Sequence, residues 1–186
     1  IDMPLQNTPP LTSADAFANK LAVFEGRSLV DYALWGGLVT DNTAELAGMD
    51  AAGAVGFKAF IAPVSLGYSS VDMGLAREAL FRIKAFGGLA GFHCEDHALI
   101  CAGEAKAKAG GGTRRAFLDS RPVVAEVIAT ANVIELARET GARVHICHVS
   151  HPRVAELVRR AQADGLSVTG ETCPHYLVFT DRKSVV

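Results

Sequence analysis

The sequence lacks three features that would each point to a class of protein. It has no basic excess, because 18 Lys and Arg stand against 20 Asp and Glu, and this balance argues against a nucleic-acid partner. It has no uncharged apolar run of the roughly 18–20 residues that a membrane span requires. Its four cysteines form no CxxC pair. They favour free thiols in a reducing, cytoplasmic compartment over a disulfide framework.

The two ends of the chain also lack familiar signals. The sequence begins at Ile1 without a methionine and ends in DRKSVV. No basic segment followed by an apolar run marks a secretory leader at the N-terminus. We therefore expect the chain to be part of a longer protein.

A regular alternation of short apolar runs and amphipathic stretches fills the rest of the chain. Runs typical of strands lie at residues 1–4, 28–35, 55–61, 88–94, 142–150 and 166–173. Helical patterns lie at residues 13–24, 72–86, 120–140 and 152–163, and the GGGTRR segment at 110–115 is expected to be a surface loop. The apolar runs do not alternate strictly, which is typical of parallel strands covered on both faces. The pattern predicts a single α/β domain over residues 1–186, either a doubly wound sheet or a (β/α) barrel.

Three histidines fall within seven positions, at His145, His148 and His151. If this segment is a strand, Val144, Ile146 and His148 share one face. In (β/α) barrels the inward column is rich in Val and Ile, and functional side chains sit at the C-terminal strand ends. This reasoning predicts that His148 is functional and that His145 is structural. His151 directly precedes a proline-led helix, so we expect it to cap that helix or contact solvent.

Two further residues would accompany His148. His93 ends an apolar run, and Lys58 lies within VGFKAFI, where an unpaired ammonium would be costly to bury. A lysine carboxylated by carbon dioxide becomes an anionic carbamate that can bridge two cations, and histidines would complete their coordination. Ions held in this way supply a hydroxide that attacks a carbonyl at neutral pH. A snorkelling or edge-strand lysine is the alternative for Lys58.

Five motifs are spread along the chain, and three of them contain Lys58, His93 or His148. They are GFKAF (56–60), HCED (93–96), FLDSRPVVAE (117–126), HICHVS (145–150) and ETCPHYL (171–177). In this order and spacing they resemble the cyclic amidohydrolases, a group that includes allantoinases, dihydropyrimidinases and dihydroorotases. The segments DYALWGGLV (31–39) and MPLQNTPP (3–10) are most similar to those of allantoinases. IAPVSLG (61–67) lacks the tyrosine that dihydropyrimidinases and hydantoinases typically carry there.

The resemblance implies a partial (β/α)8 TIM barrel covering about strands two to seven. It implies two divalent cations, with zinc as the first choice, bridged by carboxylated Lys58 and bound by His93 and His148. The family's His-x-His pair and its catalytic aspartate have no counterpart here, so we expect an incomplete second cation site and no catalytic residue within this chain. The implied reaction is the ring opening of allantoin to allantoate, so the expected ligand is a small cyclic ureide. The resemblance also implies a cytoplasmic homo-oligomer, which is a tetramer in the parent family.

Several alternatives stay open. The activity of a dihydropyrimidinase, hydantoinase or dihydroorotase would use the same ligands. A non-catalytic, dihydropyrimidinase-like assembly protein is a second class, although such a protein would be expected to have lost metal ligands. A metal-free sugar- or phosphate-binding (β/α) domain would need a phosphate-cradling glycine loop, and GAVG at 53–56 is short and apolar. We expect Lys58, His93 and His148 to converge at the C-terminal ends of a curved parallel sheet with two open edges.

Overall fold

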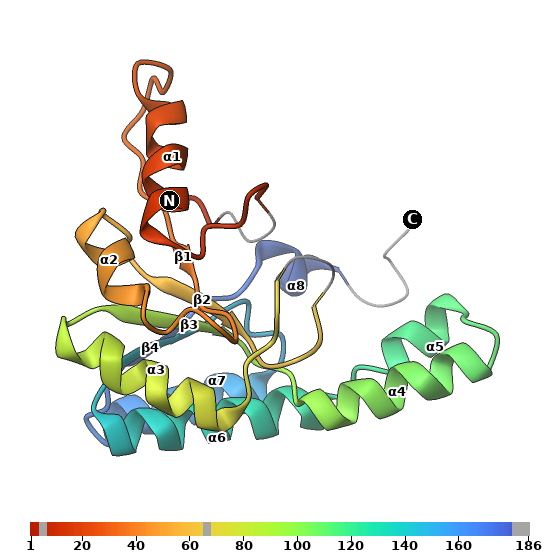
Figure 1. Ribbon diagram of the computed structural model, residues 1–186. Helices are drawn as coiled ribbons and strands as arrows, with labels where there is room; N and C mark the ends of the chain where they lie inside the picture. The colour runs from red at the N-terminus through yellow and green to blue at the C-terminus, as the bar shows by residue number, and fades with distance from the viewer. Residues whose placement is uncertain (4–6, 65–67, 180–186) are drawn as a thin grey trace.

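A single parallel sheet forms the centre of the computed structural model, which describes residues 1–3, 7–64 and 68–179. Its five strands follow the order of the chain (Figure 1): β1 (Gly36–Gly37), β2 (Phe57–Phe60), β3 (Leu89–His93), β4 (Arg143–Ile146) and β5 (Val168–Gly170). Because the strand order never reverses, the sheet is not doubly wound. The arrangement is that of part of a (β/α) barrel, as the sequence predicts.

Eight helices accompany the sheet in the described part of the chain. They are α1 (Ala14–Phe24), α2 (Leu46–Ala51), α3 (Met73–Ala85), α4 (His97–Ala109), α5 (Arg114–Asp119), α6 (Val123–Thr140), α7 (Pro152–Ala163) and α8 (Pro174–Val178). Helices α3, α6 and α7 lie along one face of the sheet, whereas α4 and α5 project from the body as an arm (Figure 1). None of the helices within the described ranges combines the length and the apolar character that crossing a bilayer requires.

The two faces of the sheet carry two different rows of aligned residues. Strand register aligns Phe57, Ala90, Val144 and Val168, and these residues pack in the core that also contains side chains of α3, α6 and α7. The neighbouring row aligns Lys58, Gly91, His145 and Thr169. Since successive residues of a strand point to opposite faces, this second row lies on the face away from those helices, here called the open face.

Trp35 covers part of the open face. A Cβ atom on Gly91 would lie 2.5 Å from the Trp35 ring, and one on Gly56 would lie 3.0 Å from it. The absence of side chains at these two glycines therefore lets the indole pack directly on the sheet. Trp35 is 8% exposed, so this part of the open face is a packed layer.

The strand boundaries differ from the sequence expectation in three places. Residues 28–35 do not form a strand, and Leu29 and Val30 in this segment are 100% and 75% exposed. Residues 1–4 contribute an isolated bridge between Asp2 and Leu34, while position 4 lies outside the described residues. Strand β4 ends at Ile146 instead of continuing to residue 150. An apolar run therefore fixes neither the burial of each of its residues nor the number of them that pair with a neighbouring strand.

The four predicted helices are confirmed as α1, α3, α6 and α7, with small shifts at their ends. Helix α4 was not predicted, because only Ile100 among its residues is buried and its sequence carries little apolar periodicity. The GGGTRR segment is an exposed connection up to Thr113, and α5 begins at Arg114. The arm therefore contains two helices that the sequence analysis did not predict, and the second overlaps the last two residues of the expected loop.

Candidate active site

Two of the predicted site residues meet at the C-terminal edge of the sheet. His93 is the last residue of β3, and its Nδ1 atom lies 2.9 Å from Nε2 of His148. His148 follows β4 with a φ of 41°, a backbone conformation that is uncommon for a residue with a side chain. Such conformations persist where the surrounding structure enforces them, often at functional sites. The turn after β4 thus directs the His148 ring toward His93.

The argument from strand alternation that selected His148 is wrong in its reasoning. Val144 and Ile146 do share a face, but they pack in the core with the helices. His145 and Cys147 are the residues of this segment on the open face, and His148 reaches His93 only because the strand has already ended. Both faces of a barrel strand are buried, so branched aliphatic residues do not identify the inner one.

Lys58 lies on β2 with 1% of its surface exposed. Its Nζ atom is 5.1 Å from the centroid of the Phe60 ring, and its ammonium interacts with the thiol of Cys147. Within the described ranges no carboxylate lies within ion-pair distance of Lys58. A buried cation without a carboxylate partner carries a large desolvation cost.

The surroundings of His148 keep its imidazole neutral. Burial, together with the positive charges of Lys58 and His93, lowers the pKa of His148 to about 4. A neutral imidazole is the form that binds a metal ion. At neutral pH, His148 therefore carries a single ring proton, and its other ring nitrogen keeps a free lone pair.

His145, Cys147 and Glu171 form a second group of ligand-type side chains, whose atoms lie within 4.8 Å of one another. The Nδ1 atom of His145 is 2.8 Å from Oγ1 of Thr169, and its Nε2 atom is 3.7 Å from the Glu171 carboxylate. Burial raises the pKa of the Cys147 thiol, and a metal ion bound here would have to displace the thiol proton, because cysteine binds metals as a thiolate. The sequence analysis did not predict this group. His145 lies on the open face because it is in register with Gly91 and Lys58.

His151 has the role that its position before a proline indicates. It is the N-cap of α7, and its Nδ1 atom accepts a hydrogen bond from the backbone N–H of Arg153 at 3.2 Å. Glu95, in contrast, was not singled out from the sequence. Its carboxylate lies 2.7 Å from Nε2 of His93, on the side of the ring opposite His148.

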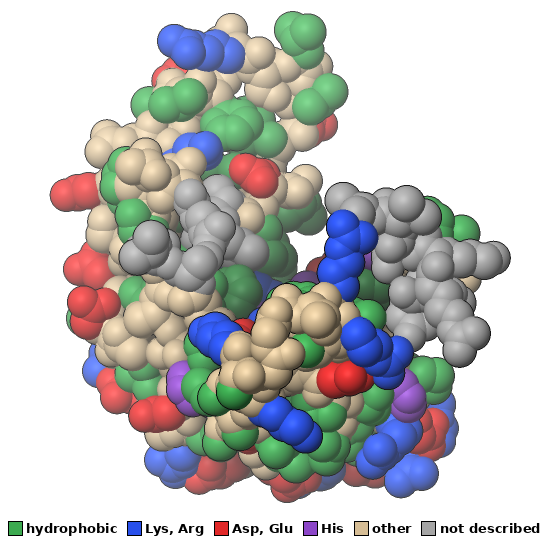
Figure 2. Space-filling model, turned by 90° about the vertical axis from the view of Figure 1, so that its right-hand side faces the viewer, with side chains coloured by type: hydrophobic (Ala, Val, Ile, Leu, Met, Phe, Trp, Pro, Cys, Tyr) green, Lys and Arg blue, Asp and Glu red, His purple; other side chains and the backbone are tan. Residues whose placement is uncertain are grey.

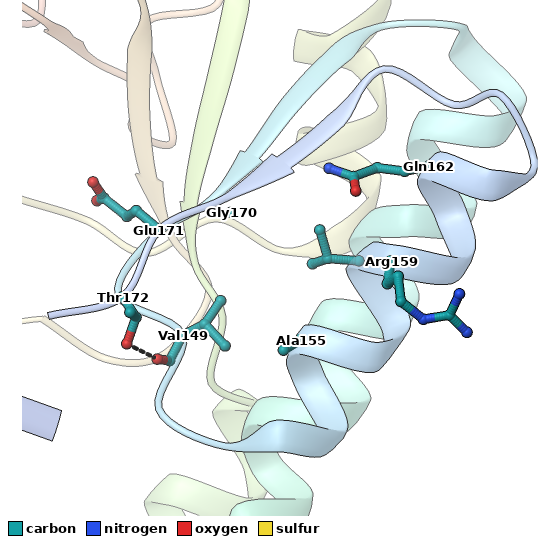
Figure 3. A pocket seen from close by; sticks show the side chains of 8 residues that line it. Val149, Ala155, Arg159, Gln162, Gly170, Glu171 and Thr172 are labelled. Carbon is teal, nitrogen blue, oxygen red and sulfur yellow. Dashed lines mark hydrogen bonds between the residues drawn. The ribbon is translucent and has the colours of Figure 1, made fainter. Parts of the chain in front are cut away.

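The surface is hollowed above the α4–α5 arm (Figure 2). A separate pocket of about 300 Å³ lies between α7 and the end of β5 (Figure 3). Arg159 and Gln162 line its helical side, and Thr172 donates a hydrogen bond to the carbonyl of Val149 at 2.7 Å. In Figure 3 the Glu171 side chain points away from the α7 side chains, so its carboxylate belongs to the open face.

Comparison with known proteins gives a consistent set of relatives. No protein-family model matches the chain. Allantoinase from Streptomyces avermitilis is 37% identical over 97% of this chain, and allantoinase from Bacillus velezensis is 40% identical over 96% of it. The solved structure of L-hydantoinase (dihydropyrimidinase) from Arthrobacter aurescens superposes with a TM-score of 0.92 and 37% identity over 97% of this chain. This chain spans about 40% of the length of each of these relatives.

Proposed function

We propose that this chain, which belongs to the cyclic amidohydrolase group, forms part of the active site of an enzyme that opens the ring of allantoin by hydrolysing an amide bond. The observation that carries the proposal is the meeting of His93 and His148, with the charge of buried Lys58 acting on His148, on a chain whose relatives are named allantoinase. An assembly protein would have no need for two facing histidines and a buried lysine that lacks a carboxylate partner among the described residues.

The donor set fits a divalent cation. Two imidazole nitrogens face one another at 2.9 Å, and the lysine beside them lacks a carboxylate partner among the described residues. Nitrogen and carboxylate-type oxygen are donors that zinc accepts. We propose that carboxylated Lys58, His93 and His148 hold one ion of a two-ion centre. The His-x-His pair and the aspartate of the group would complete the second site.

When bound, the two ions would lower the pKa of water and polarise the carbonyl of the substrate. The residues of this chain supply position and environment. The β3 and β4 ends bring His93 and His148 together, and Trp35 packs on the open face against Gly91, which is in register with Lys58. Because Lys58 is buried, a carbamate there would be shielded from solvent.

A second candidate function is the hydrolysis of hydantoins or dihydropyrimidines, which the fold similarity to L-hydantoinase favours. The same ligands would serve either reaction, so the choice between substrates depends on residues that contact the ring. We also propose a cytoplasmic homo-oligomer. The free thiols, of which Cys94 and Cys147 are buried, support a reducing compartment.

The decisive experiment measures turnover of allantoin, hydantoin and dihydrouracil by the intact protein before and after metal removal, and again after zinc is restored. We expect loss and recovery of activity, with allantoin giving the highest kcat/KM. Lys58→Ala should abolish turnover, and short carboxylic acids should restore part of it. Lys106→Ala, a change on the exposed arm, is the matched control. Near-normal turnover by Lys58→Ala would refute the bridging role of Lys58.

A further inference from the structure

The turn that follows β3 places a carboxylate directly behind His93. Glu95 Oε2 lies 2.7 Å from Nε2 of His93, while Nδ1 of the same ring faces His148. An ionised carboxylate can only accept a hydrogen bond, so the proton of a neutral His93 ring resides on Nε2. The lone pair of Nδ1 is then directed at His148. Two imidazole nitrogens at 2.9 Å need either a proton or a cation between them.

The position of Glu95 is itself supported by the arm. Arg121 Nε lies 4.0 Å from Glu95 Oε1, and its Nη2 atom donates to Glu104 at 2.7 Å. A third contact joins Nη1 of Arg121 to the hydroxyl of Ser120 at 3.0 Å, and the guanidinium lies 4.3 Å from the Phe117 ring centroid. The guanidinium is therefore fixed by groups of α4 and α5 on one side and faces Glu95 on the other.

These charges are partly shielded from water. The side chains of Glu95, Arg121 and Glu104 are 22%, 29% and 32% exposed. Ion pairs at this depth are screened less than exposed ones, so their geometry is held more firmly. The exposed pair of Arg77 with Glu139, at 50% and 47% exposure, provides a contrast elsewhere on the molecule.

The arm is also built to hold Arg121 close. A Cβ atom on Gly103 of α4 would overlap the backbone of Ser120, so only glycine allows α4 and the end of α5 to approach this closely. Asp96 caps α4 by accepting a hydrogen bond from the N–H of Leu99 at 2.9 Å, and its own N–H donates to the carbonyl of Ala125 at 3.0 Å. The arm is thus tied to the residues next to Glu95 and to α6.

We propose that Glu95 is a positioning residue, held in place by Arg121 of the arm, that fixes the proton of His93 on Nε2 and so presents Nδ1 to a divalent cation. The inference rests on the proposed function, because it assigns a purpose to a carboxylate behind a proposed ligand. Carboxylates that accept the second N–H of a ligating histidine fix its tautomer and raise its affinity for the ion. The arm would then contribute to the site without touching substrate.

The test measures two quantities in the intact protein, neither of which requires turnover. Zinc affinity is determined by competition with a chelator, and the tautomer of His93 is read from the ¹⁵N chemical shifts of its imidazole in the metal-free protein. We expect Glu95→Ala to weaken zinc binding about 10- to 100-fold and to move the His93 proton away from Nε2. Glu95→Gln retains an acceptor, so it should lie between Glu95→Ala and the parent protein. Arg121→Met should weaken zinc binding less than Glu95→Ala does.

Glu139→Ala, which breaks the exposed pair with Arg77, is the control and should change neither quantity. His93→Ala should lose zinc binding whether or not Glu95 positions the His93 ring. If His93→Ala loses zinc while Glu95→Ala binds zinc and keeps its tautomer like the parent, the positioning role is overturned and the proposed function stands. If His93→Ala also binds zinc normally, the proposed metal site fails, and the positioning role fails with it. Should Glu95→Ala fail to fold, Glu95→Gln and Arg121→Met decide the question with the same measurements.

Discussion

The facing ring nitrogens of His93 and His148 lie 2.9 Å apart although 55 residues separate the two histidines in the chain. Their strands, β3 and β4, are adjacent and parallel, so both C-terminal ends reach the same edge of the sheet. The two rings meet edge to face, with centroids 4.6 Å apart and an interplanar angle of 63°. The contact is the geometric basis for a shared ion, and it leads directly to the first prediction.

Replacing His93 or His148 with alanine is expected to lower the metal content of the purified protein, because each change removes one of two nitrogens directed at the same point. His151→Ala serves as the control, since that ring caps α7 and does not face the pair. Elemental analysis of the three variants checks the prediction. A loss of metal in His151→Ala with full occupancy in the other two would contradict it.

Lys58→Met is expected to separate stability from function. The substitution replaces a buried ammonium with an apolar side chain of similar length, and such exchanges are often neutral or stabilising. We expect the free energy of unfolding of the metal-free protein to fall by less than about 1 kcal/mol or to rise, while metal-dependent turnover disappears. Urea unfolding and an allantoin assay measure the two effects. A drop of several kcal/mol would mean that the contacts of Lys58 with Cys147 and Phe60 stabilise the fold.

Gly103→Ala tests the close packing of the arm. The added methyl group would overlap the Ser120 backbone, and overpacking of this kind costs roughly 1–3 kcal/mol. Gly74→Ala in α3 is the control, because its Cβ would meet no backbone atom within 4 Å and only Oδ1 of Asp72, the oxygen that caps α3, at 3.3 Å. That control should be neutral or gain up to about 1 kcal/mol from its better helix propensity. Thermal unfolding of both variants measures the change in stability. Equal changes in Gly103→Ala and Gly74→Ala would disprove the packing argument.

Glu156 on α7 is expected to contribute to the acid sensitivity of the protein. Hydrogen bonds from Arg159 and Arg160 lower the pKa of its carboxyl to about 2. Because this pKa is depressed in the folded state, the stabilisation is complete above the unfolded value of about 4.5 and is lost as the pH falls from there toward 2. Glu156→Gln should therefore be less stable than the parent at pH 6, and this difference should narrow at pH 3. The comparison requires low salt, since the group is exposed. A difference that stays constant with pH would argue against these ion pairs.

The order of the elements follows from the sequence alone. Apolar runs separated by amphipathic stretches identify β2, β3, β4 and β5 near their observed positions, because a parallel strand covered on both faces must be apolar over several residues. The same rule singled out Lys58, since a charge inside such a run is rare, and it placed His93 at a strand end. These inferences depend on local composition, which the sequence contains in full.

The orientation of side chains was decided only by the tertiary structure. The sequence could not reveal which face of β4 is inward, because both faces are buried, and it gave no sign of the positive φ that turns His148 toward His93. Nor could it place Arg121 beside Glu95, since that approach depends on how α4 and α5 fold back on each other. Local patterns determine which segments are strands and helices because burial and hydrogen bonding repeat with a fixed period. Contacts between distant residues depend instead on strand register and on the exact course of each turn, which form only when the whole chain packs.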